Sequence, residues 1–134
     1  MTGLVIKLGP KERILINGAV VENGDKRSKL QIVTPDAHIL RLKDALHPLE
    51  VNTPVRRVCY IMQLVLSGDA PQDTGKRQAL KGIEQLNQAF SDTESRKILS
   101  VSTEQVNGGQ YYQAMKSLRS LLSRESKIMG VSVK

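Results

Sequence analysis

The sequence predicts an α+β fold, in which a small antiparallel β unit of about five short strands precedes a C-terminal bundle of about four helices. The first 43 residues are rich in Val, Ile and Leu, alternate partly and are divided by turn residues. Pro48 and Pro54 then discourage regular structure at and before their positions. Beyond them, apolar residues recur at helical spacing.

The 134 residues fit a single compact domain, 1–134. Within it we expect a β-rich subdomain at 1–47 and a helical subdomain at 54–130. The composition, 40% hydrophobic and 25% charged, is that of a folded globular protein.

Asn17-Gly18 predicts a tight hairpin, because a two-residue type I′ turn needs positive φ at both central positions, which these residues tolerate. We expect its strands at 13–16 and 19–22. The other three strands are expected at 4–8, around Leu30 and Ile32, and at 38–43.

Alternation along the last strand, 38–43, places its even-numbered and odd-numbered residues on opposite faces. The odd-numbered face carries Ile39, Arg41 and Lys43. We therefore expect a polar face with two cations there.

The first helix is expected at 54–66, with Thr53 as N-cap, Pro54 in the first turn and Ser67-Gly68-Asp69 as its end. Most of its circumference is apolar, which is typical of a helix at the centre of a fold. A second helix is predicted by the helical spacing of Leu80, Ile83, Leu86 and Phe90.

The third helix should begin at Ser91-Asp-Thr-Glu94, which has capping-box spacing, and end at Asn107-Gly108-Gly109. Its apolar residues are Ile98, Leu99, Val101 and Val106.

A fourth helix is expected from Gln110 to Gly130. One face carries Met129 and an a/d-like seam, whose two heptads favour core packing or a small oligomer interface. The seam residues, our candidates for a partner interface, are Tyr111, Met115, Leu118 and Leu122.

The net charge of +7, from 20 Lys and Arg against 13 Asp and Glu, and a pI near 9.8 suggest a nucleic-acid partner. The excess is spread along the chain and forms no polybasic tail, so folding must assemble any binding surface.

The chain has few side chains suited to catalysis or metal binding, since it contains two histidines and a single cysteine, Cys59. No phosphate-binding loop, zinc-protease motif or nucleophile elbow appears. We expect no enzyme activity, no catalytic residues, no metal and no cofactor, and a packing role for Cys59. The longest apolar run, 58–66, is too short to cross a membrane, and no signal peptide precedes it, so we expect a cytoplasmic protein.

Seven basic residues are the candidates for RNA contact, although each can equally be a solvated surface charge. They fall on a turn, a strand end and a helix start, where phosphates could be reached, and arginine can bind them with two parallel hydrogen bonds. The candidates are Lys26, Arg27, Lys29, Arg41, Lys43, Arg56 and Arg57. The β region has no aromatic residue, which argues against recognition by base stacking.

Three segments of the chain carry a family resemblance: Leu15-Ile-Asn-Gly-Ala-Val-Val-Glu-Asn-Gly-Asp-Lys-Arg-Ser28, His38-Ile-Leu-Arg-Leu-Lys-Asp44 and Asn52-Thr-Pro-Val-Arg-Arg-Val-Cys-Tyr60. In order and approximate spacing they resemble the FlbT family of flagellum biosynthesis repressors. The resemblance covers residues 4–66. It implies a post-transcriptional regulator that represses flagellin synthesis through the 5′ untranslated leader of flagellin mRNA, lowering its translation or stability.

Residues 9–43 have the outline of a glycine-entered strand, a hairpin, a long basic turn and a proline-led final strand. This outline is similar, as a second and weaker resemblance, to that of the carbon storage regulator CsrA, a small β protein that binds mRNA leaders. In that family the final strand carries an RNA-contacting arginine, and Arg41 is the matching position here.

The leading hypothesis is therefore a non-enzymatic regulator whose β unit binds the flagellin mRNA leader. The alternative is a protein-binding module in flagellar assembly, for instance a flagellin-associated cofactor, that uses the seam on the fourth helix. Its partner would be flagellin, a flagellar regulatory protein or a second copy of the chain.

Overall fold

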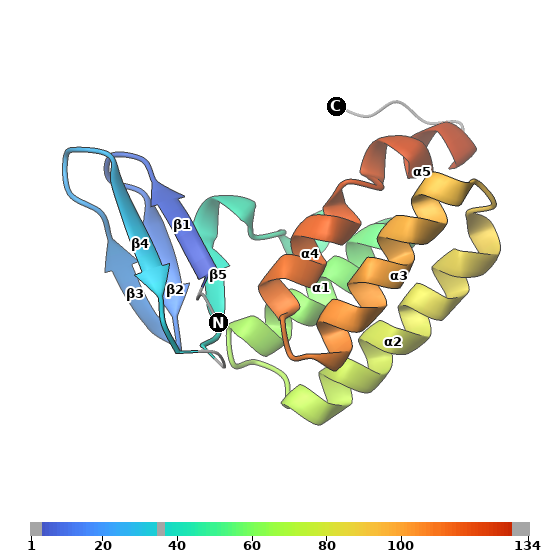
Figure 1. The fold of residues 1–134 in the computed structure, drawn as a ribbon, viewed down its shortest axis with the longest axis horizontal. Helices are drawn as coiled ribbons and strands as arrows, with labels where there is room; N and C mark the ends of the chain where they lie inside the picture. Colours follow the sequence, from blue (N-terminus) through green and yellow to red (C-terminus); the bar gives the residue numbers. More distant parts are fainter. Residues whose placement is uncertain (1–3, 35–36, 130–134) are drawn as a thin grey trace.

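The structure, a computed structural model, describes residues 4–34 and 37–129 and confirms the α+β class. A small β unit lies beside a bundle of helices (Figure 1). The strands are β1 (Leu4–Leu8), β2 (Arg13–Ile16), β3 (Ala19–Glu22), β4 (Ser28–Ile32) and β5 (Ile39–Arg41). Two 3₁₀ turns, η1 (Leu42–Asp44) and η2 (Pro48–Glu50), lead to the helices α1 (Pro54–Leu66), α2 (Gln72–Ala89), α3 (Thr93–Asn107), α4 (Tyr111–Arg119) and α5 (Leu122–Met129).

The β unit consists of two antiparallel sheets, one of β1 and β4 and the other in the order β3-β2-β5. The hairpin of β2 and β3 is confirmed, with φ of 48° at Asn17 and 86° at Gly18. Both values are positive, as a type I′ turn requires. The two sheets enclose a small hydrophobic cluster of Ile6, Leu8, Ile14 and Ile39.

The strand expected at 38–43 is shorter, because Leu42 and Lys43 belong to η1. Of its expected polar face, the two cations Arg41 and Lys43 do lie together against Glu12, whereas Ile39 belongs to the β cluster. Ile39 is 2% exposed within the β cluster, while Leu40 belongs to the core of the helical bundle and the His38 ring meets the Tyr111 ring edge-on at 6.3 Å. Strand β5 is thus buried from both sides and joins the β unit to the helices.

The first four helices form a closed bundle in which α1 contacts α2 and α4, and α3 contacts the same two helices. Helix α1 has the predicted bounds, and the Thr53 hydroxyl caps it by accepting the Arg56 N–H at 3.2 Å. Its buried face supplies the centre of the bundle.

Helix α3 begins one residue later than the capping-box spacing predicts. The Asp92 carboxylate, rather than Ser91, accepts the Ser95 N–H at 2.9 Å, since aspartate caps a helix as well as serine does. The buried face of α3 includes two small residues, Ser95 and Ser102. Val101 lies off this face and is 46% exposed.

The predicted fourth helix is two helices, α4 and α5. At the break the Ser120 hydroxyl donates to the Ser117 carbonyl at 2.6 Å and the Leu121 N–H to the Leu118 carbonyl at 2.9 Å, so local bonds replace the helical ladder. The chain turns there, and Met129, expected on the apolar face, is 48% exposed.

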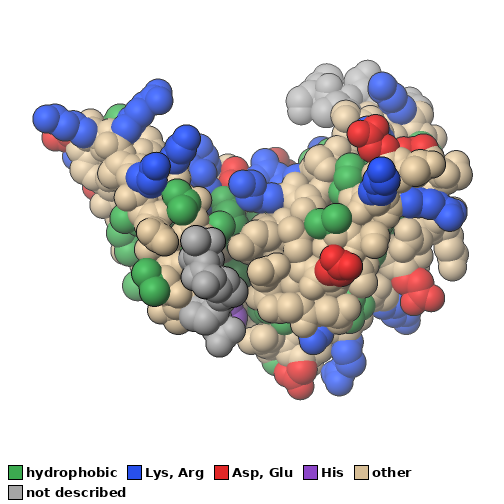
Figure 2. Space-filling model, viewed as in Figure 1, with side chains coloured by type: hydrophobic (Ala, Val, Ile, Leu, Met, Phe, Trp, Pro, Cys, Tyr) green, Lys and Arg blue, Asp and Glu red, His purple; other side chains and the backbone are tan. Residues whose placement is uncertain are grey.

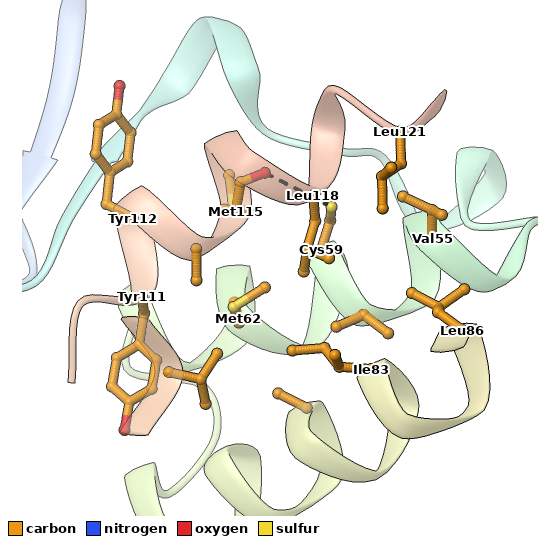
Figure 3. Close-up of a cluster of buried hydrophobic side chains, with 14 of the residues drawn as sticks. Val55, Cys59, Met62, Ile83, Leu86, Tyr111, Tyr112, Met115, Leu118 and Leu121 are labelled. Carbon is orange, nitrogen blue, oxygen red and sulfur yellow. Dashed lines mark hydrogen bonds between the residues drawn. The ribbon is translucent and has the colours of Figure 1, made fainter. Parts of the chain in front are cut away.

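The seam proposed as a partner interface is core packing in this structure. Tyr111, Met115 and Leu118 are at most 1% exposed, and Figure 3 shows them in one cluster with residues of α1 and α2. Leu122 packs against the same cluster and is partly buried. The helix face that reads as a docking seam is used inside the bundle, so the seam offers no surface to a partner.

Candidate nucleic-acid interface

A hollow of about 540 Å³ lies on the β unit, where β1, the β1–β2 loop, the start of β4 and the end of β5 meet. Its lining is basic: five cationic side chains stand against one carboxylate, that of Glu12, among the described lining residues. We call this hollow the basic groove. The cations are Lys7, Arg27, Lys29, Arg41 and Lys43. Figure 2 shows Lys and Arg side chains gathered over this end of the β unit and along the notch beside the helices.

Lys7 of β1 and Lys29 of β4 are direct partners in the antiparallel register, so both side chains leave the same face of the sheet. Like charges opposite one another destabilise a strand pair. Within the described part of the chain, no ion pair engages either lysine. The pairing therefore does not help the stability of the sheet, and it concentrates positive charge on this face.

Arg41 and Glu12 form the best-ordered polar contact of the groove. The Arg41 Nε and Nη2 atoms donate to the two Glu12 carboxylate oxygens, each at 2.7 Å. Glu12 also accepts the Gly9 N–H at 3.0 Å, while the Lys43 ammonium stays 3.8 Å away. The hydrogen bonds from Arg41 lower the pKa of Glu12 to about 2.

Arg41 also faces the helices, since it lines a second hollow together with Tyr112 of α4. Its Nη2 donates to the Lys7 carbonyl at 2.8 Å, and hydrogen bonding to Glu12 raises its pKa. The side chain is 17% exposed. Arg41, predicted as an RNA contact, is therefore largely committed to holding the groove together.

The loop between β3 and β4 is held by Asn23. Its side-chain amide donates to the Gly9 carbonyl at 2.7 Å and to the Lys26 carbonyl at 2.9 Å, and its oxygen accepts from the Ser28 hydroxyl at 2.7 Å. Arg27 and Lys29 are thus presented from a fixed backbone, although the side chains themselves are exposed.

The structure brings four of the seven predicted RNA contacts to the basic groove, namely Arg27, Lys29, Arg41 and Lys43. Lys26 is exposed on the same loop but is not among the lining residues. Arg56 and Arg57 lie in the first turn of α1, and Arg57 lines a separate hollow of about 250 Å³ between α1 and α2.

Lys7 and Asn23 were missed as site residues. Ile6 and Leu8 face the interior, so the strand alternation places Lys7 on the outer face. The sequence therefore indicated the exposure of Lys7. Its pairing with Lys29 could not be read from the sequence, because it depends on which strands become neighbours.

Neither a reactive cysteine nor a metal-binding cluster forms a second candidate site among the described residues. The Cys59 thiol is buried, and burial raises its pKa to about 12. No three His, Cys, Asp or Glu side chains in residues 4–34 and 37–129 lie together in a way that could hold a metal ion. Over the same residues, none of the helices combines the length and apolar character needed to span a bilayer.

Comparison with known proteins matches residues 4–129 to the family described as "Flagellar protein FlbT". Proteins named "Probable flagellum biosynthesis repressor protein FlbT" from Brucella ovis and Brucella abortus are 29% identical over 129 residues, 96% of this chain and 84% of theirs. The protein of the same name from Brucella anthropi is 29% identical over 126 residues, 94% of this chain and 82% of its own. No solved structure matches the chain.

Proposed function

The chain belongs to the FlbT family of flagellar proteins, and from this premise we propose that it represses flagellin synthesis after transcription, by binding the 5′ untranslated leader of flagellin mRNA in the basic groove. The relatives carry the name flagellum biosynthesis repressor, which supports the sign of the regulation. Occlusion of the leader would lower translation of the message or its stability. The role is non-enzymatic and cytoplasmic, where the message is translated.

The observation that carries the proposal is the charge of the basic groove. Of its five cations, Arg41 and Lys43 pair with Glu12, and the other three, Lys7, Arg27 and Lys29, have no ion pair within the described residues. Concentrated cations without counter-charges favour a polyanion, because neutralising its phosphates releases condensed counterions.

The mode of contact follows from the lining. Among its described residues there is no aromatic ring on which a base could stack, so the backbone of the RNA supplies most contacts. Arg27 is the residue able to add a bidentate contact to a base edge or a phosphate, because Arg41 is already engaged.

The test is binding of the purified full chain to flagellin leader RNA and to an unrelated RNA of equal length, at two salt concentrations. We expect tighter binding to the leader and a steep loss of affinity with salt. The variant R27A/K29A should lower the slope of log affinity against log salt by about 1.4, at about 0.7 per phosphate contact of a single strand.

A matched control removes the same two charges elsewhere. R77A/K97A changes two exposed cations on α2 and α3 and should bind the leader as the unaltered chain does. Equal binding of leader and unrelated RNA would overturn leader recognition. Equal binding by R27A/K29A and the control would overturn the groove as its site.

A further inference from the structure

A second hollow, of about 370 Å³, lies where β1 meets α4. We call it the junction hollow. It is lined by Val5, Ile6, Lys7, Arg41, Tyr112 and Lys116. Lys7 and Arg41 line the basic groove as well, so the two hollows meet along these two side chains. Figure 2 shows basic side chains continuing from the β unit into the notch beside the helices.

The charged side chains of the junction hollow are all cations. Its described lining carries three cations and no carboxylate. Lys116 is exposed, and within the described residues its ammonium has no ion-pair partner. It lies 5.8 Å from the centroid of the Tyr112 ring, a cation–π contact that orients the ammonium while leaving its charge unneutralised.

The uncharged part of the hollow suits the sugar or the base of a nucleotide. Val5, 49% exposed on the outer face of β1, lines the hollow together with Tyr112 of α4. An apolar floor between two lysines matches a nucleotide, whose phosphates are charged and whose sugar is not.

We propose that one single-stranded RNA segment crosses both hollows, with phosphates against Lys29 and Lys7 in the basic groove and against Lys116 of α4 in the junction hollow. This inference rests on the proposed function and extends its site from the β unit to the helices. A single strand is the form that fits, because each hollow has room for about one or two nucleotides at the usual size of a ligand pocket, whereas a duplex is too wide to enter.

Three arrangements make this a path rather than two sites. Lys7 lies directly opposite Lys29, Arg41 bonds to the Lys7 carbonyl at 2.8 Å, and Arg41 lines the junction hollow together with Tyr112 and Lys116 of α4. Arg41 is here a positioning residue, since its bonds to Glu12 and to the Lys7 carbonyl fix β1 at the point where the two hollows meet.

The test compares K116A with K97A, which removes one exposed lysine from α3, on the full chain. The probes are oligouridylates of about four and about twelve nucleotides, a duplex RNA and the flagellin leader. We expect K116A to weaken binding of the longer single strand and to lower its salt slope by about 0.7, while K97A does neither. The short oligouridylate, which fills one hollow, should bind K116A and the unaltered chain with more similar affinities.

The outcomes separate this inference from the proposed function. If K116A binds every probe as K97A does while R27A/K29A loses the leader, the path is wrong and leader binding by the basic groove stands. If K116A weakens the longer single strand but the leader has no advantage over unrelated RNA, the path stands and leader recognition is wrong. Duplex bound as tightly as the single strand, with the same loss in K116A, would overturn the single-stranded mode.

Discussion

Arg41 on β5 and Glu12 between β1 and β2 are joined by two parallel hydrogen bonds, each 2.7 Å long, from the guanidinium to both carboxylate oxygens. The Glu12 side chain is 8% exposed and that of Arg41 17%. A pair of this geometry, shielded from water, is far stronger than an exposed ion pair. Both side chains line the basic groove, where Lys7, Lys29 and Arg27 have no ion-pair partner among the described residues.

Glu12→Gln should destabilise the protein. The glutamine leaves the Arg41 guanidinium partly buried without its counter-charge, which we expect to lower the free energy of unfolding by roughly 2 kcal/mol, given that Arg41 keeps some access to water. Urea unfolding followed by far-UV dichroism measures this. Glu22→Gln is the control, because its ion pair with Arg13 is exposed and should contribute little. Equal midpoints for the two variants would contradict the assignment.

The same carboxylate makes stability depend on pH in acid. Hydrogen bonding from Arg41 lowers the Glu12 pKa from its ordinary 4.5 to about 2 in the folded protein. A group whose folded pKa is lowered stabilises the fold fully above its unfolded pKa and loses that contribution as pH falls through the folded value. The unaltered chain should therefore lose stability between about pH 4.5 and 2, and Glu12→Gln should lose less. Urea midpoints at several pH values test this, and parallel curves would refute it.

Arg27 and Arg41 should behave differently although both were predicted as RNA contacts. Arg27→Ala removes an exposed side chain, so leader affinity should fall while the urea midpoint stays unchanged. Arg41→Ala strands the Glu12 carboxylate, so the midpoint should fall together with the affinity. Arg41→Lys keeps the charge but not the two-point geometry and should restore stability in part. A stable Arg41→Ala protein with weakened RNA binding would show that Arg41 contacts RNA directly.

The elements that the sequence predicted well are those with local determinants. Asn17-Gly18 sets a turn through its own backbone preference, and Thr53-Pro54 starts α1 through a cap and a ring that already suit a helix. Neither depends on a distant residue. The break after Arg119 had no comparable signal, because it rests on a serine hydroxyl bonding three residues back and on where α5 packs.

The site was harder to predict, because its charges come together through tertiary structure. Clusters of lysine and arginine can be seen in the sequence, but Glu12 shares no local pattern with Arg41, and Lys7 meets Lys29 only through strand pairing. The seam of Tyr111, Met115 and Leu118 was located correctly as an apolar face, but its partner was not. Apolar periodicity indicates that a helix face is buried without indicating which element buries it.

Cys59 should be unreactive in the folded protein. The residue is 1% exposed, and its Sγ lies 3.9 Å from the Met115 carbonyl oxygen. Burial raises the pKa of the thiol to about 12. The thiolate is the reactive form, so a thiol reagent at neutral pH should modify Cys59 no faster than the protein unfolds. Mass spectrometry in increasing urea would follow this, with modification tracking the unfolding transition. Rapid stoichiometric labelling in native buffer would show that the thiol is accessible.

Gly82→Ala should destabilise the bundle although alanine is the better helix former by about 1 kcal/mol. A methyl group at Gly82 of α2 would overlap Val58 Cγ2 of α1, so the two helices would have to separate, at a cost of about 1–3 kcal/mol. Val58→Ala removes the clash, and in that background Gly82→Ala should instead stabilise. A double-mutant cycle on urea unfolding isolates this coupling. Gly24→Ala is the control, since its added methyl meets no atom within 4 Å. Stabilisation by Gly82→Ala alone would mean that α1 and α2 approach less closely than the structure shows.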